Sequence, residues 1–121
     1  MNKELSDALE LYKNFIIEDY RLWSETLPEH ERNDPARVKV RGKMFDLYVA
    51  SYRVIVGSRF LKVVVNNSVH SFINLKPDGK FHYGDILKAA SYKMPAKNFA
   101  RGNILIPDSY EKGSVTWTGA R

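Results

Sequence analysis

Three short turn signals in the middle of the chain constrain the fold most strongly, because each one separates two runs of strand-forming residues. The turns are Gly57-Ser58, Asn66-Asn67-Ser68 and Lys76-Pro77-Asp78-Gly79, and Gly57-Ser58 suits a two-residue type II′ hairpin. The runs that they separate are rich in β-branched and aromatic residues and comprise residues 52–56, 60–65, 69–75 and 80–83. Short turns between successive strands predict an antiparallel meander of four or five strands.

An amphipathic helix is predicted before this sheet, within residues 1–27. Apolar side chains recur there at spacings of three and four, at Leu5, Leu9, Tyr12, Ile16, Tyr20, Trp23 and Leu27. Pro28 supplies a stop. Residues 28–36 are polar and turn-rich, which predicts a connecting loop.

The rest of the chain is assigned from weaker patterns. Residues 37–92 are expected to be mainly antiparallel sheet, although 44–50 and 86–92 fit a strand or a helix equally well. Residues 94–102 predict a short helix, since Pro95 suits its first position and Gly102 the position after its end. Residues 107–121 are expected to form a loose tail. The predicted fold is a single α+β domain of 121 residues, with the long N-terminal helix packed on the sheet and a short basic helix near the C-terminus.

Charge is divided unevenly along the chain. Residues 1–36 carry four basic and nine acidic side chains, whereas residues 37–121 carry fifteen basic and five acidic ones. The second region therefore has a formal charge of +10 within a total of +5. Such a surface attracts polyanions, unless the acidic helix lies over it and neutralises it.

The residues that enzymes and metal sites require are sparse. The chain has no cysteine, which excludes disulfides and thiolate chemistry, and it lacks the common nucleotide-binding and hydrolase motifs. His70 and His82 are expected to lie about 13 Å apart along a hairpin, too far to share a metal ion. We therefore expect no catalysis, no cofactor and no metal. No apolar run approaches the roughly 20 residues of a membrane helix, so no membrane association is expected.

A first basic set occupies every second position of residues 37–43. If this segment is a strand, all four cations stand on one face as a stripe about 20 Å long, comparable to several phosphate spacings. A charged edge strand that resists aggregation is the alternative interpretation. The candidate phosphate contacts are Arg37, Lys39, Arg41 and Lys43.

A second basic set surrounds the predicted short helix. Two of its cations, Lys97 and Arg101, are spaced to share one face of that helix. Aromatic residues lie between the charges, a combination that suits single-stranded nucleic acid, where rings stack on bases and cations meet phosphates. The candidate contacts are Lys88, Lys93, Lys97 and Arg101, with Tyr92 and Phe99 as stacking residues or, alternatively, as core.

The stretch 84–103 resembles a block found in small uncharacterised proteins of tailed bacteriophages. That block runs roughly G-D-(I/V)-(L/Y)-K-A-A-(S/G)-aromatic-K-x-P-A-K-x-x-A-R-G-N, and Tyr92 stands here where tryptophan is usual. The matching residues are Gly84, Asp85, Ile86, Leu87, Lys88, Ala89, Ala90, Ser91, Tyr92, Lys93, Pro95, Ala96, Lys97, Ala100, Arg101, Gly102 and Asn103. The resemblance implies a phage origin and a place in the host bacterial cytoplasm or in a virion. It implies no catalytic residue.

These observations favour a non-catalytic accessory protein that binds DNA or RNA through a basic surface. The alternative is a protein-binding module that acts on a host protein or takes part in virion assembly. The sequence leaves the oligomeric state open.

Overall fold

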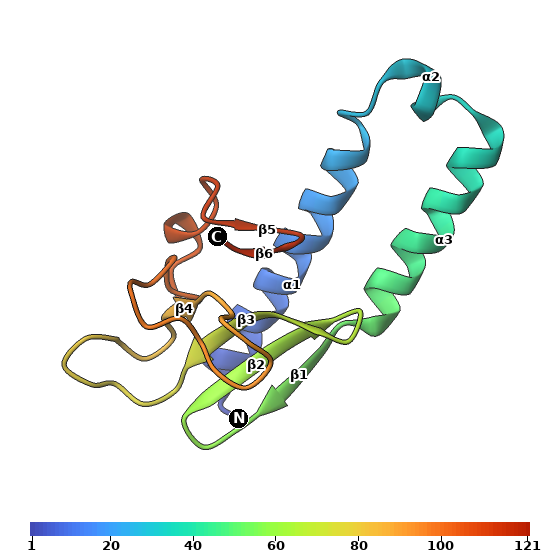
Figure 1. Ribbon diagram of the computed structural model, residues 1–121. Coiled ribbons are helices and arrows are strands. Elements are labelled where there is room, and N and C mark those ends of the chain that lie inside the picture. Colours follow the sequence, from blue (N-terminus) through green and yellow to red (C-terminus); the bar gives the residue numbers. More distant parts are fainter.

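The computed structural model describes residues 1–121 and shows an α+β architecture. Its helices are α1 (Lys3–Ser24), α2 (Glu29–Arg32), α3 (Pro35–Ser51) and the 3-10 turn η1 (Pro107–Ser109). Its strands are β1 (Arg53–Val56), β2 (Phe60–Val65), β3 (Ser68–Asn74), β4 (Ile86–Leu87), β5 (Val115–Thr116) and β6 (Gly119–Ala120). The predicted class is therefore confirmed: a long N-terminal helix accompanies a four-stranded antiparallel sheet in the order β1-β2-β3-β4 (Figure 1).

Helix α1 packs its apolar stripe against this sheet. The Oδ1 atom of Asn2 caps the helix by accepting a hydrogen bond of 2.8 Å from the backbone N–H of Leu5. Side chains at helical spacing then enter a core shared with the sheet and the C-terminal region, which comprises Leu5, Ala8, Leu9, Tyr12, Ile16, Leu61, Val63, Ile73, Ile86, Ile104, Tyr110, Val115 and Ala120. Burial of each large apolar side chain contributes about 1.5–3 kcal/mol, so this contact fixes α1 on the sheet.

Of the two hairpins of the meander, β2–β3 turns where predicted, whereas the turn of β1–β2 is shifted by one residue. Asn66 and Asn67 have φ values of 51° and 64°, as a two-residue type I′ turn requires. In the first hairpin Val56 pairs with Leu61, so the loop is Ser58-Arg59 rather than Gly57-Ser58. The N–H of Gly57 instead donates to the carbonyl of Phe60, and a Cβ at this glycine would lie 2.8 Å from that carbonyl oxygen. Glycine is needed here for close backbone approach.

The fourth strand lies further along the chain than predicted. Residues 80–83 form no strand, and β4 pairs Leu87 with Phe72 and Ile86 with Ile73. The loop between β3 and β4 is held by side-chain hydrogen bonds instead of strand pairing. Asp78 Oδ1 accepts hydrogen bonds from the N–H groups of Lys80 and Phe81, both at 2.7 Å.

Residues 37–43 are helical, which corrects the prediction of a strand. The carboxylate of Asp34 accepts hydrogen bonds from the N–H groups of Ala36 and Arg37 at 2.9 and 3.3 Å, and Pro35 occupies the first turn. This cap and proline nucleate α3 and override the alternation of cations with valines. The predicted 28–36 loop accordingly contains α2 and the cap of α3, and the sheet begins only at Arg53.

The short helix predicted for residues 94–102 is absent. The N–H groups of Ala96 and Arg101 donate to the carbonyls of Lys88 and Ile86, at 2.8 and 2.7 Å, rather than to carbonyls four residues earlier. The segment therefore runs back alongside β4. These long-range backbone bonds outweigh a local pattern that spans only two turns.

Residues 107–121 are held firmly, contrary to the prediction of a loose tail. Tyr110, Val115 and Ala120 are buried in the main core, and β5 pairs with β6. The Oδ2 atom of Asp19 on α1 also accepts a hydrogen bond of 2.8 Å from the N–H of Trp117. Tyr110 and Trp117 thus place this segment through contacts with residues that are distant in the sequence.

The second half of α1, α2 and α3 form a projection that we call the helical arm (residues 20–51). Figure 1 shows it leaving the sheet toward the upper right, with α2 at its tip. At its base a small cluster of Tyr20, Tyr48 and Val65 packs against Trp117. No helix of the chain combines the length and the hydropathy that crossing a membrane requires.

A buried polar chain links α1, β3 and β5. The Tyr12 hydroxyl and Ser71 Oγ are 2.8 Å apart, Ser71 Oγ lies 3.0 Å from His70 Nδ1, and His70 Nε2 lies 2.7 Å from the carbonyl oxygen of Thr116. A carbonyl only accepts, so Nε2 carries the proton and Nδ1 accepts from Ser71. Desolvation lowers the pKa of His70 from 6.5 to about 4, so the imidazole is neutral.

This buried histidine predicts acid sensitivity. The unfolded chain takes up a proton near pH 6.5, whereas the folded chain resists uptake until about pH 4. The His70 contribution to the free energy of unfolding is therefore complete above pH 6.5 and falls by up to about 1.4 kcal/mol per pH unit below it. Urea unfolding at pH 7, 6 and 5 measures this slope. His70→Gln should reduce this dependence of stability on pH, whereas His30→Gln, a control at an exposed position, should leave it unchanged. Equal slopes in the wild type and both variants would contradict the assignment of the pH dependence to His70.

Candidate nucleic-acid interface

The chain between β4 and Asn103 forms a closed excursion, whose residues 88–100 we call the basic loop. Its two ends lie together because the N–H of Ile86 donates to the carbonyl of Gly102 at 2.8 Å and the N–H of Arg101 returns a bond to Ile86. Inside the loop the N–H groups of Ala90 and Ser91 both donate to the carbonyl of Met94 at 3.1 Å. The loop is thus compact and ordered without regular secondary structure.

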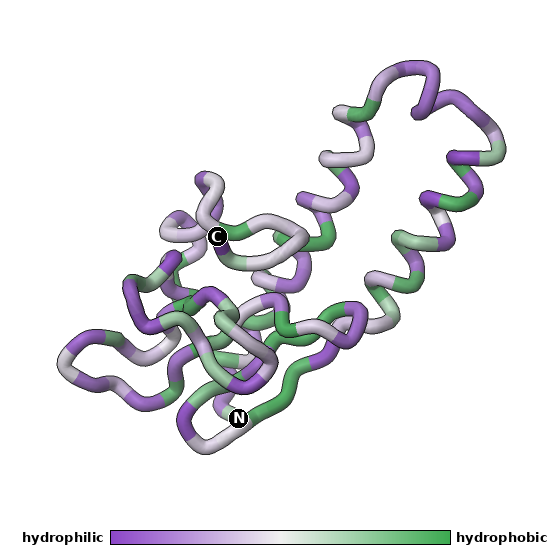
Figure 2. Tube along the Cα trace, in the orientation of Figure 1, coloured by the Kyte–Doolittle hydropathy of each residue, from purple (hydrophilic) through white to green (hydrophobic).

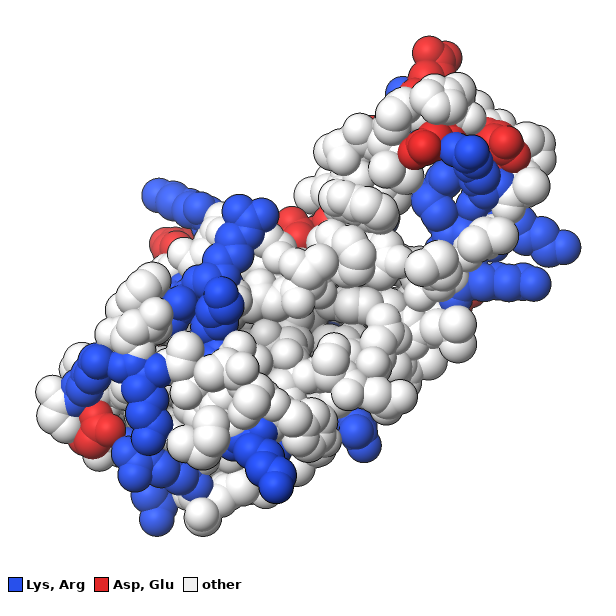
Figure 3. Space-filling view, viewed as in Figure 1, with Lys and Arg blue, Asp and Glu red and all other residues white.

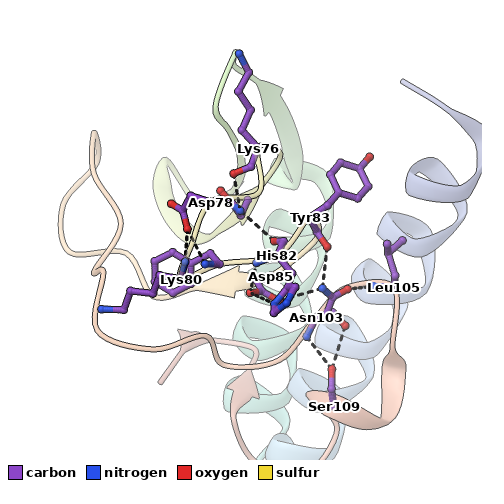
Figure 4. A network of polar contacts seen from close by, with 11 residues as sticks. Lys76, Asp78, Lys80, His82, Tyr83, Asp85, Asn103, Leu105 and Ser109 are labelled. Atoms are coloured by element: carbon purple, nitrogen blue, oxygen red, sulfur yellow. Dashed lines mark hydrogen bonds and ion pairs between the residues drawn. The ribbon is translucent and has the colours of Figure 1, made fainter.

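A polar lock closes the base of the basic loop (Figure 4). The side-chain amide of Asn103 donates to the carbonyl of Tyr83 at 2.8 Å and to Asp85 Oδ1 at 3.0 Å, and its oxygen accepts from the N–H of Leu105 at 2.9 Å. Asp85 Oδ2 accepts from the N–H of His82 at 2.8 Å. The two side chains thereby satisfy one another and three backbone groups in a largely buried place.

Two glycines make room for this lock. Gly84 has φ +88°, and a Cβ there would lie 2.8 Å from Asn103 Oδ1. Gly102 has φ +134°, and a Cβ there would lie 2.8 Å from the carbonyl oxygen of Ser109. Both positions disfavour any other residue. The Gly-Asp and Gly-Asn pairs at the two ends of the 84–103 block therefore act structurally: they hold the loop closed.

The loop presents two aromatic rings to solvent. Tyr92 is 48% exposed and Phe99 is 59% exposed, so the alternative interpretation of both as core residues is wrong. A cation stands by each ring: Lys62 Nζ lies 4.3 Å from the ring centroid of Tyr92, and the Arg101 guanidinium lies 3.9 Å from that of Phe99. The predicted cations Lys88, Lys93 and Lys97 are exposed on the same loop.

Arg101 has a structural role instead of the predicted phosphate contact. Its side chain is buried and donates to the carbonyl of Arg121 at 2.5 Å, and to Asn98 Oδ1 and the carbonyl of Phe99 at 2.6 Å each. Desolvation lowers the pKa of the guanidinium. Since no helix forms here, Lys97 and Arg101 also do not share a helix face.

Cations that the sequence analysis did not select lie beside the basic loop. Lys80 Nζ donates to the carbonyl of Lys97, and Lys62 reaches Tyr92 from β2. Residues 57–100 contain seven Lys and Arg but only two Asp, of which Asp85 is buried and Asp78 pairs with Arg59 at 3.2 Å. The seven cations are Arg59, Lys62, Lys76, Lys80, Lys88, Lys93 and Lys97. Of the four cations that the sequence analysis did not select, Arg59, Lys76 and Lys80 lie in or next to predicted turns and Lys62 lies within a predicted strand, so no sequence signal groups them in space.

The first basic set does not form the predicted stripe. Each residue turns a helix by about 100°, so Arg37 and Arg41 share one side of α3 while Lys39 and Lys43 share another. Arg37 pairs with Glu31 at 3.1 Å, and Arg41 donates to the carbonyl of Arg32 at 3.1 Å. Figure 3 shows cations gathered at the two ends of the molecule with mostly uncharged surface between them. The two predicted sets therefore do not merge.

The cavities of the molecule lie outside the basic loop. One of about 450 Å³ lies between α1 and α3, where three apolar side chains line it together with charged ones of both signs, among them Arg41 and Glu25. Another, of about 400 Å³, opens near Trp23 and Val40. No group of three or more His, Asp or Glu side chains is arranged to hold a metal ion. The basic loop differs from these cavities in presenting exposed lysines that form no ion pair within the chain, beside two half-exposed rings.

Removal of the lock should loosen the basic loop. In Asn103→Ala the buried carboxylate of Asp85 and two backbone groups lose partners, so we expect a loss of about 2–3 kcal/mol in the free energy of unfolding. Urea unfolding measures this loss, and hydrogen exchange should show faster exchange at Leu105 and across the loop. Asn14→Ala, at an exposed position of α1, should change stability by less than about 0.5 kcal/mol. Equal stability of the two variants would show that the lock is dispensable.

Comparison with known proteins gives one match. Neither a search of curated proteins nor a search of solved structures found a match to this chain. The model of one protein family, described as a family of unknown function (DUF7717), matches residues 5–121. This match covers α1, the sheet, the basic loop and the C-terminal hairpin, so the chain belongs to that family of unknown function.

Proposed function

We propose that the protein is a small non-catalytic accessory protein that binds nucleic acid through the basic loop and the cations beside it. The observation that carries the proposal is the pair of half-exposed rings, Tyr92 and Phe99, among exposed lysines on one ordered loop. Aromatic rings stack on unpaired bases for about 1–3 kcal/mol per base, while cations neutralise phosphates. Single-stranded DNA or RNA offers both unpaired bases for the rings and phosphates for the cations.

Charge and rigidity both support this surface. The seven cations of residues 57–100 are opposed by a single exposed carboxylate, that of Asp78, so the local field attracts an anionic strand. The lock at Asp85 and Asn103 fixes the loop before a ligand binds, which reduces the entropy lost on association. No base-reading pattern is evident in the loop, so binding is proposed to have little sequence specificity.

The setting is part of the same proposal. The resemblance of residues 84–103 to a block in small tailed-bacteriophage proteins supports a phage origin. The protein would then act in the cytoplasm of a bacterial host or within a virion.

Oligonucleotide binding tests the proposal. Fluorescence anisotropy with labelled single-stranded and duplex oligonucleotides should show tighter binding to the single strand, with an affinity that falls steeply as salt rises. Lys93→Glu/Lys97→Glu should weaken binding at least about tenfold and reduce the salt dependence. Tyr92→Ala/Phe99→Ala should also weaken binding but leave the salt dependence nearly unchanged, because it removes stacking and no charge.

The matched control is Lys3→Glu/Lys112→Glu, which makes the same change in net charge at exposed positions outside residues 57–100. It should retain most of the affinity. If both double lysine variants lose the same affinity, net charge alone explains the binding and the defined interface is contradicted. Binding that does not depend on salt would also contradict the proposal.

A protein-binding module remains the second candidate, and one specific observation favours it. The helical arm exposes several large apolar side chains away from the basic loop, at Leu22, Trp23, Val38, Val40, Met44 and Leu47. Apolar groups gathered on one projection are typical of protein interaction surfaces. In this candidate function the arm would contact a host protein or a virion component.

A further inference from the structure

The cavity between α1 and α3, which we call the arm cavity, has a lining of mixed chemistry. Its volume of about 450 Å³ lies within the range of about 300–1,000 Å³ that is typical of small-molecule sites. Tyr20 on α1 and Val38 and Phe45 on α3 form its apolar lining, and most of the other lining residues are charged. Figure 2 shows hydrophilic and hydrophobic positions alternating along both helices of the arm. A ligand in this cavity therefore meets rings and charges together.

A glycine keeps the arm cavity open. Gly42 lies within α3 on the same side as Val38 and Phe45 and lines the cavity, and a Cβ there would meet nothing within 4 Å. Only proline is less favourable than glycine in a helix interior, and neither a positive φ nor close packing requires glycine at this position. Gly42 thus weakens the helix and preserves space, which is the combination expected of a binding site.

Two arginines at the end of the arm cavity nearer α2 have no counter-ion. Arg41 Nη2 donates to the carbonyl of Arg32 at 3.1 Å, and neither guanidinium takes part in an ion pair within the chain. The third arginine of the lining, Arg21, is neutralised by Glu18 and Glu25, at 2.5 and 2.8 Å. Guanidinium groups bind phosphates with two parallel hydrogen bonds. Arg32 and Arg41 are therefore the cations that remain available to an anionic ligand.

The other end of the arm cavity offers two rings and a free carboxylate. The ring centroids of Tyr20 and Phe45 are 5.3 Å apart, with an angle of 80° between the ring planes. Asp46 also lines the cavity and forms no ion pair. At about 100° per residue, Arg41 and Asp46 lie on opposite flanks of the row that contains Gly42 and Phe45. The cavity thus presents cations on one side, an apolar floor and a hydrogen-bond acceptor on the other side.

We propose that the arm cavity binds a nucleoside monophosphate. Its phosphate accepts hydrogen bonds from Arg32 and Arg41, its base packs on Tyr20 and Phe45, and Asp46 accepts a hydrogen bond from an amino group of the base. A purely apolar ligand would leave the two guanidinium groups and the carboxylate without partners, and inorganic phosphate would leave the rings uncovered. The inference is independent of nucleic-acid binding by the basic loop, because it uses residues at the other end of the molecule.

Isothermal titration calorimetry of the full-length protein with adenosine monophosphate (AMP) tests this proposal. We expect one site per chain, with a dissociation constant on the order of 10–100 µM. Adenosine lacks the phosphate and inorganic phosphate lacks the base, so each should bind at least about tenfold more weakly than AMP. Failure of AMP, GMP and CMP to bind at millimolar concentration would overturn the proposal.

Substitutions at Gly42 separate loss of the cavity from loss of the fold. Gly42→Leu fills part of the cavity and favours the helix more than glycine does. The affinity for AMP should therefore fall at least about tenfold, while the midpoint of urea unfolding stays the same or rises. Gly42→Ala is the matched control, because it adds a single methyl group. It should also raise the midpoint and keep the affinity within about threefold. Unchanged affinity in Gly42→Leu would place the ligand elsewhere.

Charge variants locate the phosphate. Arg32→Gln/Arg41→Gln should weaken AMP binding at least about tenfold and leave adenosine binding unchanged. The matched control is Lys39→Gln/Lys43→Gln, which makes the same change in net charge at exposed positions of α3 that do not line the cavity. It should retain the affinity, as should Lys93→Glu/Lys97→Glu in the basic loop. Equal losses in the arginine and lysine variants of the arm would contradict a defined site, and loss of AMP binding in the basic-loop variant would assign AMP to that loop.

Discussion

The fold depends on the burial of one side of α1 against a sheet that is shorter than the helix. A helix of 22 residues is about 33 Å long, whereas the longest strand has seven residues and spans about 23 Å. The first half of α1 therefore covers the sheet and the second half extends past it. Because α3 must return from the end of α1 to the start of β1, a projecting arm is the geometric consequence. The C-terminal hairpin braces the point of departure through Trp117, which stacks on Tyr20.

At the opposite end the same sheet supports an irregular but ordered loop. Its edge strand β4 has only two residues, so the following chain supplies backbone partners that another strand would have supplied. The lock of Asp85 and Asn103, with glycines at 84 and 102, fixes the point of return. Structural residues of the 84–103 block thereby hold the base of the loop, and its lysines and rings are left free at the surface. The 84–103 block therefore combines structural residues at its two ends with exposed lysines and aromatic rings between them.

The molecule thus has two distinct surfaces at its two ends. The basic loop carries lysines beside two half-exposed rings, and we propose that it binds an anionic strand. The helical arm carries exposed apolar side chains among the cations of α3. Electrostatic attraction of the basic end weakens with salt, whereas apolar burial on the arm does not.

The sequence by itself determined the features that rest on local rules: the amphipathic helix α1, the antiparallel pairing of β2 and β3, and the Asn66-Asn67 turn. Each follows from spacing or from backbone preference within a few residues. A local rule also fixes residues 37–43, where the Asp34 cap and Pro35 prevailed over the alternation of cations with valines. Only the tertiary structure decided the state of residues 94–102, where the amides of Ala96 and Arg101 found partners beside and on β4. It also decided which candidate cations are free, since burial of Arg101 against Arg121 depends on contacts twenty residues apart. Patterns along the chain report which way each segment prefers to fold, but which segments meet is settled by the packing of distant side chains.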